Sequence, residues 1–118
     1  MATMTVQTIA EGGLNPAYSA VAATDDFDNA LGDVLLHVKN NNAGACVVTI
    51  NPVAGASRPI PGLGAMTKAA AGASIPAGQE RIFGPFPPGA FNNASGRVTA
   101  GYGVTASVTA AAFRLAQP

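Results

Sequence analysis

Fourteen glycines and nine prolines are spread along the whole 118-residue chain and interrupt every part of it. Proline cannot donate to a strand ladder and ends helices, and glycine weakens both, so such a chain is divided into short elements. Short runs of β-branched and apolar residues between these breaks favour strands, and no strand–helix alternation is present. The sequence predicts an all-β fold, a single antiparallel β-sandwich over residues 1–118. It would be jelly-roll-like or closed as a small barrel, with seven or eight short strands.

The clearest strand pattern lies in the first half of the chain. Residues 33–39 alternate, with Val34, Leu36 and Val38 on one face. Residues 45–51 alternate in the same way, and the Asn- and Gly-rich segment between the two runs tolerates turn conformations. The pattern predicts that these two strands pair as a hairpin.

Weaker patterns divide the rest of the chain into strands and loops. The acidic residues 24–29 are expected to form a polar loop, and the proline-rich residues 52–64 an extended loop. A turn is expected at residues 76–79, and the prolines of residues 85–89 should take the chain out of the sheet. The other expected strands are residues 3–9, residues 17–23, a strand ending at Ile75, residues 80–84, and a second hairpin made by residues 97–102 and 104–115.

Charge and side-chain size restrict the classes of partner. The chain has six basic and six acidic residues and therefore no net charge. Charged residues make up 10% of the chain, far below the usual fraction of about a quarter. Binding to nucleic acid or to an anionic membrane needs an excess of Lys and Arg, so both are disfavoured. Alanine, which buries little surface, makes up 25 residues. A neutral surface of small side chains gives little protection against association, so the composition favours a chain packed against other proteins.

Catalytic and metal sites are not expected. His37 and Cys46 are the only histidine and cysteine, too few for a metal site or a nucleophile triad. Asp25, Asp26 and Asp28 lack the glycine and glutamate of a calcium loop. They are interpreted as a solvated or helix-capping loop, with a weak cation site as the alternative. Without a dinucleotide fingerprint, no cofactor is expected. The first residues lack the features of a secretory signal and no apolar run could span a bilayer, so synthesis in a reducing cytoplasm is expected.

Three segments together resemble small structural proteins of tailed bacteriophages: Ile75–Pro88, Leu35–Asn41 and Thr99–Leu115. The resemblance is to short β-rich virion proteins, above all to head decoration (cement) proteins. It implies a non-enzymatic protein that binds the major capsid protein on the capsid exterior, as a homo-oligomer such as a trimer, after assembly in the host bacterial cytoplasm. Two alternatives remain: another virion subunit (head–tail connector, tail or fibre base), or a carbohydrate- or ligand-binding sandwich.

Contact residues are expected among the apolar side chains of the irregular segments. Each would be an anchor pressed into a pocket of the capsid or of a sister subunit. The alternative is that the phenylalanines point into this protein's own core. Residues 1–10 and 110–118 are further candidates, as docking arms. The candidate anchors are Phe83, Phe86, Phe91, Ile60 and Leu63.

Overall fold

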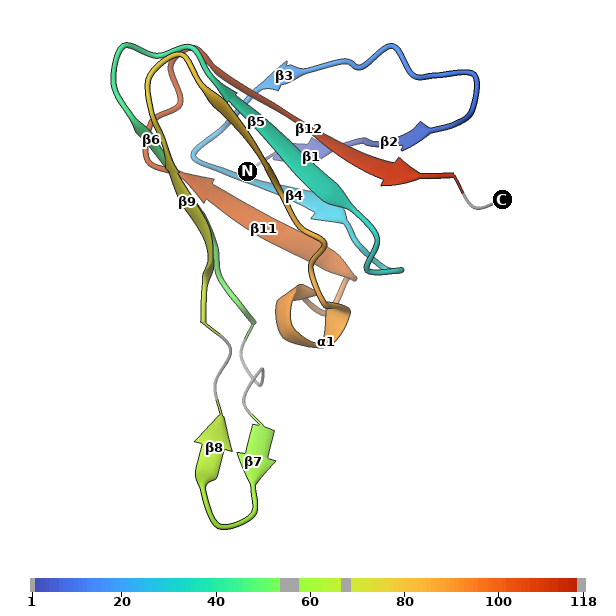
Figure 1. The fold of residues 1–118 in the computed structure, drawn as a ribbon, viewed down its shortest axis with the longest axis vertical. Coiled ribbons are helices and arrows are strands. Elements are labelled where there is room, and N and C mark those ends of the chain that lie inside the picture. The colour runs from blue at the N-terminus through green and yellow to red at the C-terminus, as the bar shows by residue number, and fades with distance from the viewer. Residues whose placement is uncertain (1, 54–57, 67–68, 117–118) are drawn as a thin grey trace.

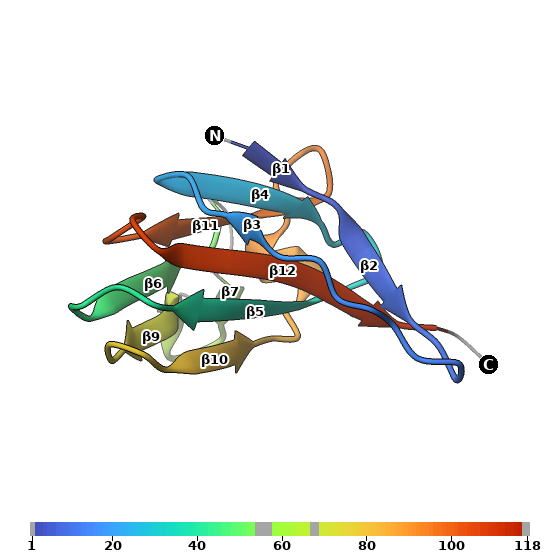
Figure 2. The same ribbon diagram turned by 90° about the horizontal axis from the view of Figure 1, so that it is seen from above.

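The computed structural model describes residues 2–53, 58–66 and 69–116, and it confirms the β-sandwich. Two five-stranded sheets pack face to face (Figures 1 and 2). Sheet I has the order β1 (Ala2–Met4), β4 (Thr24–Asp28), β11 (Arg97–Tyr102), β6 (Cys46–Ile50), β9 (Ala71–Ile75). Sheet II has the order β10 (Glu80–Phe83), β5 (Leu35–Asn40), β12 (Val108–Leu115), β2 (Val6–Ile9), with β3 (Ser19–Ala20) also paired to β12.

The inward faces of the two sheets form the core. On β5 and just before it, Val34, Leu36 and Val38 are buried, as the alternation predicted. The largest fully buried side chains also include Phe27 of β4 and Ile50 of β6. Every second residue of each central strand therefore faces the opposite sheet, which is the burial pattern of a sandwich.

The two predicted hairpins are wrong, because the two strands of each lie in opposite sheets. β5 belongs to sheet II and β6 to sheet I, and β11 and β12 are separated in the same way. The predicted turn at residues 76–79 is present, with Gln79 N–H donating to Pro76 O at 3.1 Å. It too connects β9 of sheet I to β10 of sheet II. We call a connection between strands of opposite sheets an arch. An arch and a hairpin within one sheet bury the same alternate residues, so the alternation of apolar residues could not show which of the two connects these strands.

Asn40 holds two of these arches together. Its side chain is fully buried at the end of β5. Its Nδ2 donates to Gly44 O at 3.0 Å in the β5–β6 connection and to Ile75 O at 2.9 Å at the start of the β9–β10 connection. Its Oδ1 accepts from the N–H of Asn42 at 3.0 Å. One buried amide therefore satisfies polar backbone groups of two connections, which an apolar residue could not do.

Two other segments differ from the sequence prediction. Residues 24–28 are not a polar loop but strand β4, paired with β11 and β1, because Phe27 fills the core and brings the acidic residues into the sheet. Residues 52–64 were expected to form an extended loop, but part of this range is a strand. β7 (Arg58–Ile60) pairs with β8 (Gly64–Met66) to form a hairpin that projects from the sandwich (Figure 1). We call residues 58–66 the finger.

The N-terminal segment closes the open side of the sandwich. The predicted single strand is divided: β1 pairs with β4 in sheet I, and β2 pairs with β12 in sheet II. Both pairings are parallel, so the sheets are mixed rather than wholly antiparallel. Residues 2–9 are exposed or half-buried, with only Met4 and Val6 packed partly against the core. This segment is therefore an edge covering, attached mainly through its backbone.

Candidate interaction surface and cavity

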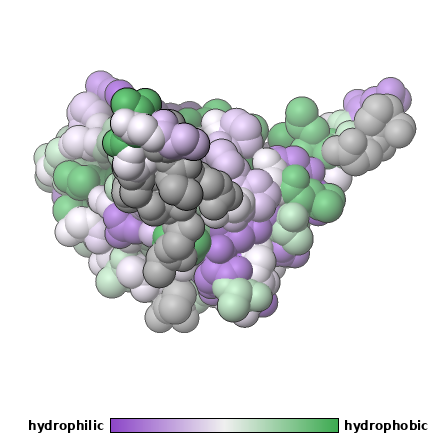
Figure 3. Space-filling view, turned by 90° about the horizontal axis from the view of Figure 1, so that it is seen from below, coloured by the Kyte–Doolittle hydropathy of each residue, from purple (hydrophilic) through white to green (hydrophobic). Residues whose placement is uncertain are grey.

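The outer face of sheet II carries several apolar side chains beside the charged residues Lys39 and Glu80. In the strand register Leu35 lies opposite Phe113, and His37 lies opposite both Ile82 and Ala111, so these residues share the face that points away from the core. Ile82 is 64% exposed, and Leu115 at the end of β12 is 61% exposed. We call Leu35, Ile82, Phe113 and Leu115 the outer patch. Hydrophobic side chains also lie along the projecting arm formed by the ends of β2 and β12 (Figure 3).

A hollow of about 260 Å³ lies within this face, between the outer patch and the segment that follows β2. His37 lines it, and the hydroxyl of Tyr18 lies 2.7 Å from His37 Nδ1. His37 Nε2 lies 3.3 Å from a carboxylate oxygen of Glu80. The Tyr18 ring also packs edge-on against Phe113, and Lys39 Nζ lies 3.9 Å from its centre. His37 thus anchors Tyr18 on the sheet, while Cys46 is buried in the inward core, so the two share no site.

The finger presents the most exposed large apolar side chain in the described part of the chain. Leu63, at its tip, is 81% exposed, as expected for a contact residue. The backbone of Ile60 lies in β7, but its side chain is outside the described part of the structure.

The other candidate anchors belong to this protein's own core. Phe86 and Phe91 are each 2% exposed, and their ring centroids lie 5.7 Å apart. Phe86 also contacts Phe27, with centroids at 5.8 Å. Phe83 is half-buried against the same cluster. The expectation that Phe86 and Phe91 are exposed contact residues is therefore wrong. The prolines take the chain out of the sheet, as predicted, but into the short helix α1 (Pro88–Phe91), in which Phe91 is buried; Phe86, which precedes the helix, is buried as well.

The terminal segments are not free arms in this structure. Residues 110–115 lie in β12, between β5 and β2, where Ala110 and Ala112 are buried in the core. Residues 2–9 form the two edge strands described above. Residues 1 and 117–118 lie outside the described part of the chain.

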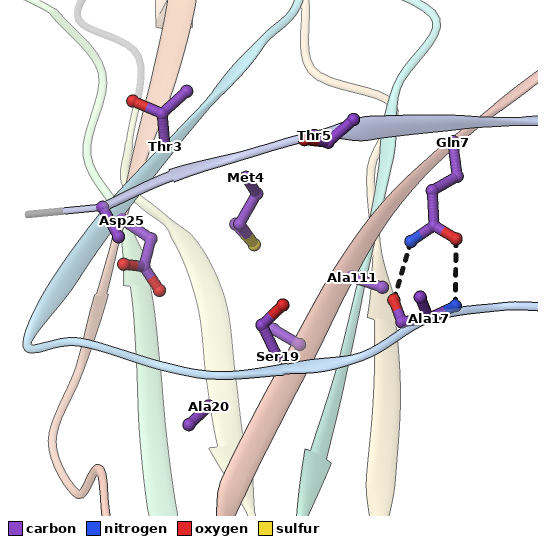
Figure 4. Close-up of a pocket in the computed structure, with 11 residues that line it drawn as sticks. Thr3, Met4, Thr5, Gln7, Ala17, Ser19, Ala20, Asp25 and Ala111 are labelled. Atoms are coloured by element: carbon purple, nitrogen blue, oxygen red, sulfur yellow. Dashed lines mark hydrogen bonds between the residues drawn. The ribbon is translucent and has the colours of Figure 1, made fainter.

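A cavity of about 430 Å³ lies between the N-terminal segment, β3 and β12. Thr3, Met4 and Thr5 line one wall, and Ser19 lines the wall opposite (Figure 4). At one end Gln7 joins the walls: its Nε2 donates to Ala17 O at 2.7 Å, and its Oε1 accepts from Ala17 N–H at 3.0 Å.

Asp25 lines the other end of this cavity (Figure 4). The residue is 2% exposed, and its Oδ2 accepts from the N–H of Ala22 at 3.2 Å. Its Oδ1 is buried and has no hydrogen-bond partner among the described residues. The hydroxyl of Tyr102 is also buried without a partner there. Burial raises the pKa of Tyr102, and Asp25 and Cys46 raise it further, so this phenol stays protonated at neutral pH.

The remaining acidic side chains of β4 have different surroundings. Asp26 is 8% exposed, and its Oδ2 lies 3.8 Å from Nη1 of Arg97. Asp28 is exposed and accepts from Ala30 N–H at 3.0 Å. Asp28 is solvated as expected, although it lies in a strand and not in a loop, whereas Asp25 and Asp26 are buried, so the interpretation of a solvated loop is wrong for them. The described residues contain no group of three or more His, Cys, Asp or Glu side chains that could hold a metal ion.

Comparison with known proteins adds no relative. No family model, no curated protein and no solved structure matches this chain. In the described residues, no helix is long and apolar enough to cross a membrane.

Proposed function

We propose that this protein is a decoration protein of a bacteriophage capsid, which binds the outer surface of the capsid and stabilises the head. Its role is structural, and its partners are the major capsid protein and further copies of itself. The sequence resemblance suggested this function, and the shape of the sandwich gives it a contact surface.

The observation that carries the proposal is the outer patch. In a sandwich, the outward side chains of each strand are ordinarily polar because they meet water. Here Leu35, Ile82, Phe113 and Leu115 lie on that face or at its border. Ile82 and Leu115 are more than half exposed, Leu35 is half-buried, and Phe113 is buried beside the ring of Tyr18. Large apolar side chains that are exposed on one face of a small domain favour the docking of another macromolecule there.

The finger supplies a second contact at a distance from the first. It extends beyond the sandwich (Figure 1) and ends in exposed Leu63. A protein with two separated apolar contacts can join two neighbouring subunits of a shell, and it thereby resists their separation.

The proposal is tested by binding the purified protein to capsids that lack it. Ile82→Asp places a charge in the outer patch, and Val47→Asp is the matched control, because Val47 is a 51% exposed strand residue of sheet I. Burying an isoleucine contributes about 1.5–3 kcal/mol, so Ile82→Asp should weaken binding roughly tenfold or more, while Val47→Asp should bind like wild type. Circular dichroism checks that both variants are folded. Equal binding of Ile82→Asp and wild type would refute a docking role for the outer patch.

A deletion of the gene tests the stabilising role. Particles without the protein should assemble but release DNA at a lower temperature than wild-type particles. Unchanged heat stability would contradict a cement function.

A further inference from the structure

Asp25 has a buried carboxylate with no positive partner in the described part of the chain. The ion pairs found there join His37 to Glu80, Arg97 to Asp26, and Arg114 to Asp33. Asp25 receives a single backbone hydrogen bond on Oδ2, and Oδ1 receives none. A buried charge without compensation is costly, so a group that supplies positive charge and an N–H donor at this point would be bound favourably.

The cavity beside Asp25 has the walls to hold such a group. Its volume of about 430 Å³ lies within the range of small-ligand sites, roughly 300–1,000 Å³. The hydroxyl of Ser19 faces Met4 across the cavity (Figure 4) and can accept a hydrogen bond, and the rest of the lining is largely apolar. The apolar part consists of Met4 and the methyl groups of Ala2, Ala17, Ala20, Ala110 and Ala111.

We propose that this cavity binds a primary ammonium group carried on an alkyl chain, with Asp25 as its counter-charge. An ammonium has three N–H donors, which suit the carboxylate oxygen of Asp25 and the hydroxyl of Ser19, while the alkyl chain lies against the alanines. A single carboxylate is too little for calcium, which takes six to eight oxygen ligands and usually several acids. The alkylammonium can belong to a free amine or to a lysine side chain of a partner protein. The site does not depend on the proposed capsid function, since it lies outside the outer patch.

The test is a titration of the purified full-length protein with n-butylammonium chloride. Thermal unfolding and NMR chemical shifts are followed at constant ionic strength, with potassium chloride and tetramethylammonium chloride as controls that lack N–H donors. We expect the unfolding temperature to rise with n-butylammonium only, together with saturable shifts of cavity resonances. A second arm uses Nα-acetyl-lysine amide against Nα-acetyl-norleucine amide. Binding of the lysine derivative alone would assign the site to a protein side chain, and binding of both amines would show that a free amine suffices.

Two variants separate the site from a general salt effect. Asp25→Asn should weaken amine binding at least tenfold while leaving the free protein as stable as wild type or more so. Asp28→Asn removes an exposed charge of the same strand and should keep the full response. Ala20→Leu adds volume to the cavity wall formed by β3 and should also weaken binding. An amine response equal to that of potassium, or one that persists unchanged in Asp25→Asn and Ala20→Leu, would overturn the proposal.

Discussion

Replacing Asn40 by alanine should cost this protein a large part of its stability. An amide has two N–H donors, and here they reach the carbonyl oxygens of Gly44 at 3.0 Å, Ile75 at 2.9 Å and Pro76 at 3.3 Å. The side chain also accepts one hydrogen bond, from Asn42. At about 1 kcal/mol net for each of three hydrogen bonds, the loss in unfolding free energy is about 3 kcal/mol. The whole domain has only about 5–15 kcal/mol.

Urea unfolding followed by circular dichroism measures this loss, and the unfolding temperature should fall by roughly 10–15 °C. Asn42→Ala is the matched control: its side-chain bonds to Ala106 and Gly44 are solvent-exposed, so its loss should stay under about 1 kcal/mol. Asn40→Asp retains the size of the side chain but turns a carboxylate towards carbonyls, so it should be less stable than Asn40→Ala. If the unfolding free energies of Asn40→Ala and Asn42→Ala differ by less than about 1 kcal/mol, the role of Asn40 in the arches is refuted.

Three further predictions follow from the core. Phe86→Ala should lower the unfolding free energy by about 3–5 kcal/mol in the same assay, and a loss below 1 kcal/mol would contradict its burial. Gly72→Ala should be more destabilising than Gly62→Ala, although both glycines have positive φ. A Cβ at Gly72 would clash with the backbone oxygen of Val48, whereas a Cβ at Gly62 would meet open space. Equal unfolding temperatures of the two variants would refute this. Because burial raises the pKa of Tyr102 in the folded state, the stability it contributes is present below the ordinary phenol pKa of about 10 and is lost as the pH rises above it. Tyr102→Phe should reduce that alkaline loss in unfolding curves, and an unchanged alkaline loss would contradict the shift.

The sequence was sufficient for the fold class and for many buried positions, because alternation reports which side chains face the core. The sequence was insufficient to show which connections join strands of opposite sheets. Residues 41–45 look like a hairpin loop, but the fully buried Asn40 and its contacts to Ile75 belong to an arch. That difference depends on partners 35 residues away. No local pattern contains such information.

Polar and irregular segments misled the sequence analysis for a similar reason. Three aspartates near Phe27 resemble a solvated loop, yet one buried aromatic ring is enough to keep the segment as a strand. Phe86 and Phe91 lie near prolines and were expected at the surface, but both rings are buried and pack against each other. Leu63, at the tip of the finger, was correctly expected to be exposed.

The outer patch and the cavity could not have been predicted from the sequence. The outer patch needs the pairing of β5 with β10 and β12, which brings Leu35, Ile82 and Phe113 onto one face. The cavity needs the parallel attachment of the N-terminal segment, which places Ala2 beside Asp25. Both are products of long-range strand order, which a single sequence does not display.

The copy number of this chain in purified phage particles tests the central claim most directly. Quantitative mass spectrometry against the major capsid protein gives that number. A decoration protein should be present at a level comparable to the capsid subunits. Its absence from particles, or its presence only at the level of a single connector ring, would contradict the account.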